Sequence, residues 1–359
     1  MIDTEVKQYS YNDLVIVPAY LSSIKSRKEC NVEDSFGYLP LFTAPMSSVV
    51  DNNNFQLFED NKIHSILPRT ENIIVRLNHC YNNFAAFSLS EFEEYFVNWD
   101  AGKKRYALID IANGHMKYLF DLVEKARETN KNQLVIMIGN IANPDTYRYC
   151  ISKGIDYVRC GIGTGFGCTT STNVGVHYAP GSLIDSIFQI KKDYVEIGYT
   201  DLPKIVADGG IRNSSDIIKA LALGADYVMC GYVFTKMVES AAKTTIVRKI
   251  GESFLTLEDL LKTDEENIKQ YIRDKKIQKL YYGMSTKRAQ SEMGNKILKT
   301  SEGVQRIINA EYTMKGWIEN FVDYLRSAMS YCDSRTLEEF KNKTKLVPLS
   351  ANSFNLINK

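Results

Sequence analysis

Short apolar segments recur along the chain, and polar turns and stretches with helical period lie between them. Their β-branched residues and continuous apolar character are typical of strands that are buried on both faces of a parallel sheet. Eight strands are expected, at 41–46, 63–67, 85–90, 106–112, 134–140, 157–163, 204–210 and 227–233. Helices are expected at 116–128, 144–154, 181–193 and 214–224. Eight such units in one chain predict an α/β fold, a closed (β/α)8 TIM barrel, rather than an open sheet.

The stretch at 245–312 departs from this pattern because it is charged and weakly periodic, and it precedes a final helical segment at 316–332. It is too long for an ordinary barrel loop, so we expect an insertion after the eighth strand that forms a flap over the site. A surface excursion or an oligomer contact fits its composition equally well. No repeat or Pro/Ser-rich linker divides the sequence, so residues 1–359 are expected to form one domain.

Charge and cysteine content argue against several classes of protein. The 359 residues include 44 Lys and Arg against 43 Asp and Glu, so no single-sign field attracts nucleic acid or an anionic membrane. The polar N-terminal stretch does not resemble a signal peptide, and no apolar run approaches the length of a membrane span. The seven scattered cysteines include no Cys-x-x-Cys pair, which argues against a disulfide framework or a zinc site. We therefore expect a cytoplasmic protein with free thiols.

A glycine-rich loop, GIGTGFGCTT at 161–170, follows the sixth expected strand. Four glycines in seven positions allow positive φ and a close approach of the backbone to a ligand or cation. Cys168 ends this loop at the C-terminal mouth of a barrel strand, where the architecture places catalytic groups. A lone cysteine is more often buried and inert. The glycines and the two adjacent threonines nevertheless favour Cys168 as a nucleophile, and the other six cysteines are interpreted as inert.

Two further glycine-containing segments follow the seventh and eighth expected strands, ADGGIR at 207–212 and Gly231-Tyr232. Loops at these positions bind phosphate in many barrels through backbone N–H groups and a short helix N-terminus. Asp208 would repel a phosphate, so it is better suited to accept hydrogen bonds from ribose hydroxyls beside it. Turn geometry alone also explains these glycines, but their corresponding positions favour a bound phosphate.

Polar residues also end the fourth and fifth expected strands, in DIANGH at 110–115 and in Gly139-Asn140. The carboxylate of Asp110 and the side-chain amides of Asn113 and Asn140 are suited to orient a ribose or a carboxamide. His115 is a candidate for acid–base chemistry, although a histidine beside a glycine turn is more often a solvated surface residue.

These motifs together resemble the family of inosine monophosphate dehydrogenases and guanosine monophosphate reductases. The resemblance extends over nearly the whole chain and rests on GIGTGFGCTT, IVADGGIR, DIIKALALGADYVMCG, DIANGH, GN and LYYGMS. The Cys-Thr-Thr loop is the most specific of these motifs, because FMN-dependent barrel oxidoreductases contain strings similar to IVADGGIR.

The resemblance implies covalent catalysis. Cys168 would attack C2 of the purine of a bound mononucleotide, and Thr170 with Glu302 would form the proton relay that deamination requires. It also implies NADPH as hydride donor, a homotetramer, and potassium (K+) on the backbone carbonyls of Gly163, Gly165 and Cys168. The substrate would contact Met46, Asp208, Gly210, Gly231, Tyr232, Tyr282, Gly283, Met284 and Ser285. The cofactor would contact Asp110, Ala112, Asn113, Gly114 and Asn140.

Two absences favour the reductase reaction. Residues 284–303 contain no Arg-Tyr pair, the hydrolytic base that dehydrogenases carry on the flap, and 68–85 leaves no room for their regulatory insertion. We therefore expect NADPH-dependent reductive deamination of GMP to IMP and ammonia. Two alternatives stay open. One is IMP oxidation by a dehydrogenase without regulatory modules, and the other is reduction of a related purine nucleotide or deoxynucleotide. They stay open because Ser47, Ser171 and residues 174–180 differ from the residues typical of the family at these positions. An FMN-dependent oxidoreductase and a catalytically silent nucleotide-binding protein are the hypotheses from other classes.

Overall fold

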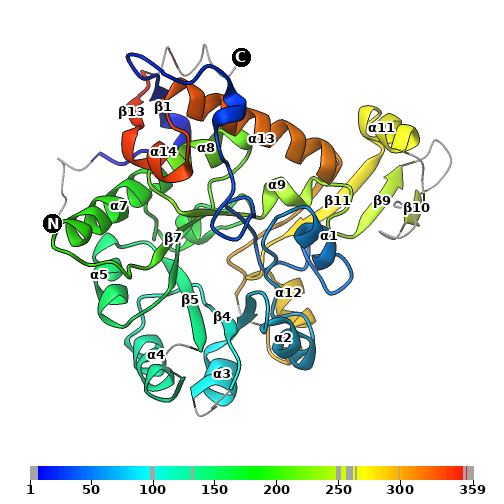
Figure 1. Ribbon diagram of the computed structural model, residues 1–359. Coiled ribbons are helices and arrows are strands. Elements are labelled where there is room, and N and C mark those ends of the chain that lie inside the picture. Colours follow the sequence, from blue (N-terminus) through cyan, green and yellow to red (C-terminus); the bar gives the residue numbers. More distant parts are fainter. Residues whose placement is uncertain are drawn as a thin grey trace.

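The computed structural model describes residues 7–97, 102–130, 133–247, 252–255, 262, 265–298, 300–350 and 353. Among these residues, seven parallel strands form a curved sheet in the order β2-β8-β7-β6-β5-β4-β3 (Figure 1). The strands are β2 (Leu41–Thr43), β3 (Ala85–Phe87), β4 (Arg105–Asp110), β5 (Leu134–Ile141), β6 (Tyr157–Cys160), β7 (Lys204–Asp208) and β8 (Tyr227–Cys230).

The segment at 64–67 closes this sheet into a barrel. Parallel bridges join His64 to β2 and Leu67 to β3. The carbonyl of His64 accepts a hydrogen bond from the amide of Thr43, and that of Leu67 accepts one from the amide of Ala86, both at 2.9 Å. The α/β barrel predicted from the sequence is therefore confirmed, and the second expected strand contributes to it only through these bridges.

The four helices predicted from periodicity are present as α4 (Lys117–Asn130), α5 (Pro144–Ser152), α7 (Pro180–Glu196) and α8 (Ser214–Ala222). Asn143 and Asn213 cap two of them, because their side chains accept hydrogen bonds from first-turn amides of α5 and α8. The other helices outside the insertion are α1 (Phe55–Asp60), α2 (Ile73–His79), α3 (Leu89–Phe92), α6 (Thr170–Asn173), α9 (Tyr232–Thr235), α13 (Met314–Tyr331) and α14 (Leu337–Lys343), with single turns at Tyr11–Asp13, Arg27–Glu29 and Glu93–Val97. No described helix combines the length and the apolar character of a membrane span.

Alternate residues of the barrel strands pack into two different hydrophobic clusters. On β4, Leu108 joins a cluster with Met137 and Met229 of other strands, whereas Ala107 and Ile109 join the larger cluster that includes residues of the helices. This alternation is the period of two that every strand imposes on its side chains. Because both faces are buried, the strand segments are mostly apolar, which explains the pattern seen in the sequence.

The insertion after β8 forms a small antiparallel sheet in the order β10-β9-β11-β12. Its elements are β9 (Thr244–Val247), β10 (Glu252–Leu255), α11 (Glu265–Arg273), β11 (Ile277–Tyr282), α12 (Lys287–Glu292) and β12 (Gln305–Asn309). Lys279 anchors this sheet, since its buried ammonium group donates hydrogen bonds to the carbonyls of Val238 (2.7 Å) and Ser240 (3.2 Å). Nearly all of these elements lie within the insertion expected at 245–312, of which 248–251, 256–261, 263–264 and 299 are outside the described residues. Its role as a moving flap stays a prediction.

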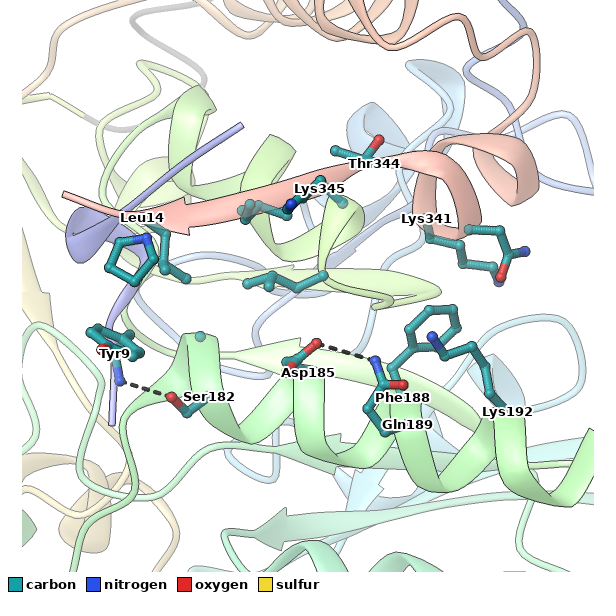
Figure 2. Close-up of a pocket in the computed structure, with 16 residues that line it drawn as sticks. Tyr9, Leu14, Ser182, Asp185, Phe188, Gln189, Lys192, Lys341, Thr344 and Lys345 are labelled. Atoms are coloured by element: carbon teal, nitrogen blue, oxygen red, sulfur yellow. Dashed lines mark hydrogen bonds between the residues drawn. The ribbon is translucent and has the colours of Figure 1, made fainter. Parts of the chain in front are cut away.

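The two ends of the described chain meet on one side of the barrel. There β1 (Leu14–Val17) pairs antiparallel with β13 (Lys345–Pro348), beside α14 (Figure 1). A cavity of about 370 Å³ lies between this ribbon and α7, whose Ser182, Asp185 and Gln189 line it (Figure 2). None of the site residues predicted from the sequence lines this cavity.

Candidate active site

Cys168 lies in the loop between β6 and α6. It is half-buried, whereas the other six cysteines are buried. Burial raises the pKa of each of those six thiols, and that of Cys80 rises to about 11. A raised thiol pKa makes the thiolate scarce at neutral pH, so these six side chains are poor nucleophiles. Cys168 is therefore the cysteine whose surroundings suit reaction with a ligand.

Three side chains form a hydrogen-bonded row at this cysteine. The Cys168 thiol donates to Thr170 Oγ1 at 3.2 Å, and the Thr170 hydroxyl donates to Glu302 Oε2 at 2.7 Å. We call this row the relay. A thiol, a hydroxyl and a carboxylate in this order can pass a proton from sulfur toward the carboxylate and return one to a leaving group. The three residues that the family resemblance assigned to catalysis therefore form one continuous row of hydrogen bonds.

The insertion holds the cysteine loop in place through its backbone. Cys168 forms an antiparallel bridge with Gly303. The amide of Thr169 donates to the carbonyl of Glu302 at 2.8 Å, and the amide of Val304 donates to the carbonyl of Gly167 at 2.9 Å. These contacts join two segments that are far apart in the chain, and they fix the Glu302 carboxylate next to Thr170.

Two glycines are required by close approach around this loop. At Gly303, a Cβ would lie 2.9 Å from Ser285 Oγ and 3.2 Å from the carbonyl oxygen of Gly167. Gly161 has φ +141° and a Cβ there would collide with the carbonyl oxygen of Asp208. The loop after β6 and the end of β7 therefore pack directly against each other, which only a residue without a Cβ allows at position 161.

The loops after β7 and β8 lie beside an aromatic cluster. Tyr232 stacks on Phe166 with ring centroids 3.9 Å apart, and Tyr281 meets both rings edge-on at 5.7 and 5.8 Å. The amide of Gly210, expected to face a phosphate, donates to the carbonyl of Thr164 at 2.8 Å. Met46 lies beside Gly231, with its sulfur 3.1 Å from the position that a Cβ on that glycine would take.

Tyr281, which the sequence analysis did not name, lies in this aromatic cluster, whereas its neighbour Tyr282, a predicted substrate contact, has other partners. The Tyr282 hydroxyl donates to Glu292 at 2.9 Å and accepts a hydrogen bond from Ser47 Oγ at 3.1 Å. The guanidinium of Arg288 lies 5.0 Å from the centroid of the Tyr282 ring. Tyr282 thus connects β11 to α12 and to the loop after β2. Side chains alternate along a strand, so the two consecutive tyrosines of β11 point to opposite sides. This alternation is the sequence signal that distinguishes Tyr281 from Tyr282.

The segment after β11 is hydrogen-bonded to the start of α12. The carbonyl of Gly283 accepts a hydrogen bond from the Thr286 hydroxyl at 2.8 Å, and the carbonyl of Ser285 accepts one from Gln290 at 3.2 Å. Met284 is half-buried and Ser285 is exposed. This segment therefore ends in a capped helix next to Gly303.

Two carboxylates at the mouth share one arginine. Arg159 Nη1 donates to Asp110 Oδ1 at 2.6 Å, and Arg159 Nε donates to Asp208 Oδ2 at 2.9 Å. Asn140 Nδ2 donates to Asp208 Oδ2 at 2.7 Å and to the carbonyl of Gly161 at 2.6 Å. Burial lowers the pKa of the Arg159 guanidinium, but Asp208 and Asp110 more than offset this and raise it. Arg159 was not predicted as a site residue, and its only signal was a charge within the apolar segment at 157–163.

The loop after β4 packs on the loop after β5. The amide of Gly114 donates to the carbonyl of Asn140 at 2.7 Å, and Asn113 Oδ1 accepts from the amide of His115 at 3.2 Å. His115 Nε2 accepts a hydrogen bond from the amide of Ala142, so Nδ1 carries the proton and donates to Thr146 Oγ1. Burial lowers the pKa of His115, which favours this neutral form. His115 is therefore a half-buried structural link rather than a solvated residue. Ala112 precedes this turn and is exposed.

The carbonyls expected to hold potassium lie in the loop before Cys168. The Gly165 carbonyl accepts a hydrogen bond from the Cys168 amide at 3.0 Å. Gly163 has φ +74° and lies against Ser171 and the carbonyl of Val176. No group of three His, Cys, Asp or Glu side chains that suits a metal ion occurs in the part of the chain that the structure describes.

The sequence model of the IMP dehydrogenase / GMP reductase domain matches residues 103–356. The chain is 30% identical over 248 residues to an inosine-5'-monophosphate dehydrogenase of Chlorobaculum tepidum, and the match covers 68% of this chain but 45% of that protein. It is 25% identical over 349 residues to a GMP reductase of Lactobacillus delbrueckii subsp. bulgaricus, with 94% and 93% of the two chains covered. It is 29% identical over 278 residues to a GMP reductase of Staphylococcus epidermidis, with 73% and 82% covered.

The chain thus spans less than half of the Chlorobaculum protein, whereas it aligns with nearly the whole of the Lactobacillus protein. The matched residues 103–356 are more than half of the chain, and they contain Cys168, Thr170 and Glu302. The chain therefore belongs to the IMP dehydrogenase / GMP reductase family.

Proposed function

We propose that this protein is a GMP reductase, which converts GMP to IMP and ammonia with NADPH as the hydride donor. The observation that carries the proposal is the relay, in which Cys168, Thr170 and Glu302 are joined by hydrogen bonds of 3.2 and 2.7 Å. A nucleophile linked to a hydroxyl and a carboxylate meets the two needs of this reaction, a covalent bond to the purine and a proton for the leaving amine.

The relay accounts for each proton in the deamination half of the reaction. The Cys168 sulfur forms a bond to C2 of the purine, which is electrophilic because it lies between two ring nitrogens. The thiol proton passes toward Glu302 through the Thr170 hydroxyl. The bond from C2 to the exocyclic amine then breaks as Thr170, backed by Glu302, returns a proton, and ammonia leaves. A thioimidate between Cys168 and the purine remains.

The second half of the reaction requires a hydride, and NADPH supplies it at C2 when bound. The carbon–sulfur bond breaks as the new C2–H bond forms, which releases IMP and the Cys168 thiolate. The overall reaction consumes one hydride and one proton for each ammonia released. The protein contributes the position of the purine over Cys168, and the insertion covers the relay from the side of Gly303.

The geometry at the mouth supports the assignment of binding residues. Arg159 and Asn140 donate to Oδ2 of Asp208, and Arg159 donates to Oδ1 of Asp110. The remaining oxygens, Asp208 Oδ1 and Asp110 Oδ2, accept no hydrogen bond from the described residues. We assign Asp208 to the ribose of the nucleotide, and Asp110 with Asn140 to the nicotinamide side. These acceptors fit hydroxyl and carboxamide donors. Tyr281 and Tyr232 supply an aromatic wall near the glycine loops.

The reductase is favoured over the dehydrogenase by what the insertion contains. Hydrolysis of the thioimidate requires a base to activate water, and residues 284–303 offer no Arg-Tyr pair for this role. The near end-to-end alignment with the Lactobacillus GMP reductase supports the same choice. The second candidate is oxidation of IMP, or reduction of a related purine deoxynucleotide, because Ser47 and Ser171 differ from the residues typical of the family at these positions. The choice of NADPH over NADH, potassium on the 163–168 carbonyls, a homotetramer and a cytoplasmic location belong to the same proposal.

The test is a direct comparison of two reactions with purified protein. GMP with NADPH should lose nicotinamide absorbance and release ammonia in equal amounts, while IMP with NAD should show no reaction. Oxidation of IMP without reduction of GMP would overturn the proposal in favour of the dehydrogenase. A yellow preparation containing FMN would instead indicate a flavin-dependent oxidoreductase.

Cys168→Ala provides the matched test of the nucleophile. The variant should lose turnover and keep nucleotide affinity, because the change removes only the sulfur from a half-buried position. Cys230→Ala, at a buried cysteine that ends β8, is the control and should keep activity. A Cys168→Ala protein with a near-normal rate would show that another group forms the covalent bond, or that no covalent bond forms.

A further inference from the structure

Four neighbouring strands of the barrel contribute to one buried polar cluster. Asp110 ends β4, Asn140 lies near the end of β5, Arg159 is on β6, and Asp208 ends β7, and these strands are adjacent in the sheet. The Arg159 side chain is 12% exposed, and those of Asp110 and Asp208 are 12% and 16% exposed. Arg159 therefore links the two acids directly through one planar guanidinium group.

The hydrogen bonds divide this arginine between two ligand subsites. One arm reaches Asp110, assigned above to the nicotinamide side, and the other reaches Asp208, assigned to the nucleotide ribose. Asn140 fixes Asp208 from a second direction. Each carboxylate thus has one oxygen held by the protein and one left for a ligand.

We infer that Arg159 is a positioning residue that couples the two halves of the site, so that a bound nucleotide raises the affinity for the nicotinamide cofactor and the reverse. This inference rests on the proposed function, because it uses the two subsites assigned there. A nucleotide that donates hydroxyl hydrogen bonds to Asp208 fixes that carboxylate, the guanidinium joined to it, and hence Asp110. The second ligand then loses less conformational entropy on binding, which is positive coupling through ordering.

A purely structural arginine would behave differently. If Arg159 only neutralised two buried carboxylates, its loss would lower stability and weaken both ligands without altering the effect of one on the other. Lysine keeps the positive charge but lacks the planar fork that contacts both acids at once. Arg159→Lys therefore separates charge neutralisation from coupling.

The experiment measures binding in the absence of turnover. Calorimetry would give the dissociation constants of GMP alone, of NADP+ alone, and of NADP+ with GMP saturating. The proteins compared, with Arg159 as in the wild type or changed to lysine, all carry Cys168→Ala so that no thioimidate forms. The wild-type protein should bind NADP+ several-fold more tightly with GMP present. In Arg159→Lys each ligand alone should bind about tenfold more weakly, and GMP should no longer change the affinity for NADP+.

Arg105→Lys is the matched control, because Arg105 is also a buried arginine, 2% exposed, at the opposite end of β4. It should lower the melting temperature and keep the coupling. An Arg159→Lys protein with wild-type coupling, or a wild-type protein that binds both ligands independently, would overturn the inference. A wild-type protein that binds and couples both ligands but does not reduce GMP would refute the proposed function and leave the inference standing. A wild-type protein that binds neither ligand would refute both.

Discussion

Glu302→Gln tests the relay most directly. Glutamine has nearly the shape of glutamate, and its amide oxygen can still accept the 2.7 Å hydrogen bond from Thr170. The backbone contact of Glu302 with Thr169 and the bridge between Gly303 and Cys168 do not depend on the side chain. The substitution therefore keeps the geometry of the loop and removes only the ability of the carboxylate to take up and return a proton.

The size of the effect follows from this restricted loss. A positioned acid or base contributes about 10²- to 10⁴-fold to a rate, which corresponds to about 3–5 kcal/mol of the barrier. We expect kcat for GMP reduction to fall by this factor, while the dissociation constant of GMP changes by less than about threefold, because no contact to the nucleotide is assigned to Glu302. Ammonia release and nicotinamide oxidation should fall together, since the amine must leave before the hydride can add.

The assay is steady-state oxidation of NADPH with ammonia measured in parallel, and calorimetry of GMP binding on the same preparations. Thr170→Ser should keep most of the activity because it keeps the hydroxyl between sulfur and carboxylate. Glu311→Gln is the control, since Glu311 is on the same insertion but is half-exposed and paired with Lys236. A Glu302→Gln enzyme that retains a third of the wild-type kcat would refute the proton-transfer role.

Two further predictions concern buried charges. Asp226 accepts hydrogen bonds from Lys191 at 2.6 Å and Lys341 at 2.7 Å in a buried site. Asp226→Asn should therefore lower the free energy of unfolding by about 3–5 kcal/mol and the melting temperature by roughly 5 °C. An unchanged thermal unfolding curve would contradict this. Burial lowers the pKa of Lys279 to about 7. Between this value and the ordinary lysine pKa of about 10.4, the unfolded chain binds a proton that the folded chain lacks, so stability rises with pH by up to about 1.4 kcal/mol per unit. Lys279→Met should remove that rise, which urea denaturation at pH 7 and pH 9.5 would measure, and identical pH dependence in both proteins would show the reasoning to be wrong.

The fold was predictable because its signals are local. Each barrel strand is a short apolar run and each helix shows a period near 3.6, so the eight units could be counted before their arrangement was known. The segment at 63–67 shows where this approach ends, since it closes the barrel through isolated bridges rather than a full strand. Its bridging role depends on the strands that lie on either side of it in the barrel, and the local sequence does not show which strands these are.

The candidate site was predictable only in part. Cys168 stands out because glycines and threonines surround it in the chain, and the family resemblance named Thr170 and Glu302. The sequence gives Arg159 no such context, because one charge in an apolar strand has many explanations. The same is true of Tyr281, whose contact with Phe166 and Tyr232 brings together β11, the loop after β6 and α9.

The sequence by itself determined the barrel class and the positions of its eight strand segments, and it singled out Cys168 as the candidate nucleophile, because each of these depends on residues close together along the chain. Only the tertiary structure decided that Glu302 meets Thr170 across 132 positions of sequence. It also decided that one guanidinium contacts Asp110 and Asp208, each 49 positions away from it. Such contacts depend on how the loops after β4, β6 and β7 and the insertion pack at one mouth. That packing is set by the closure of the barrel as a whole and not by any segment of it.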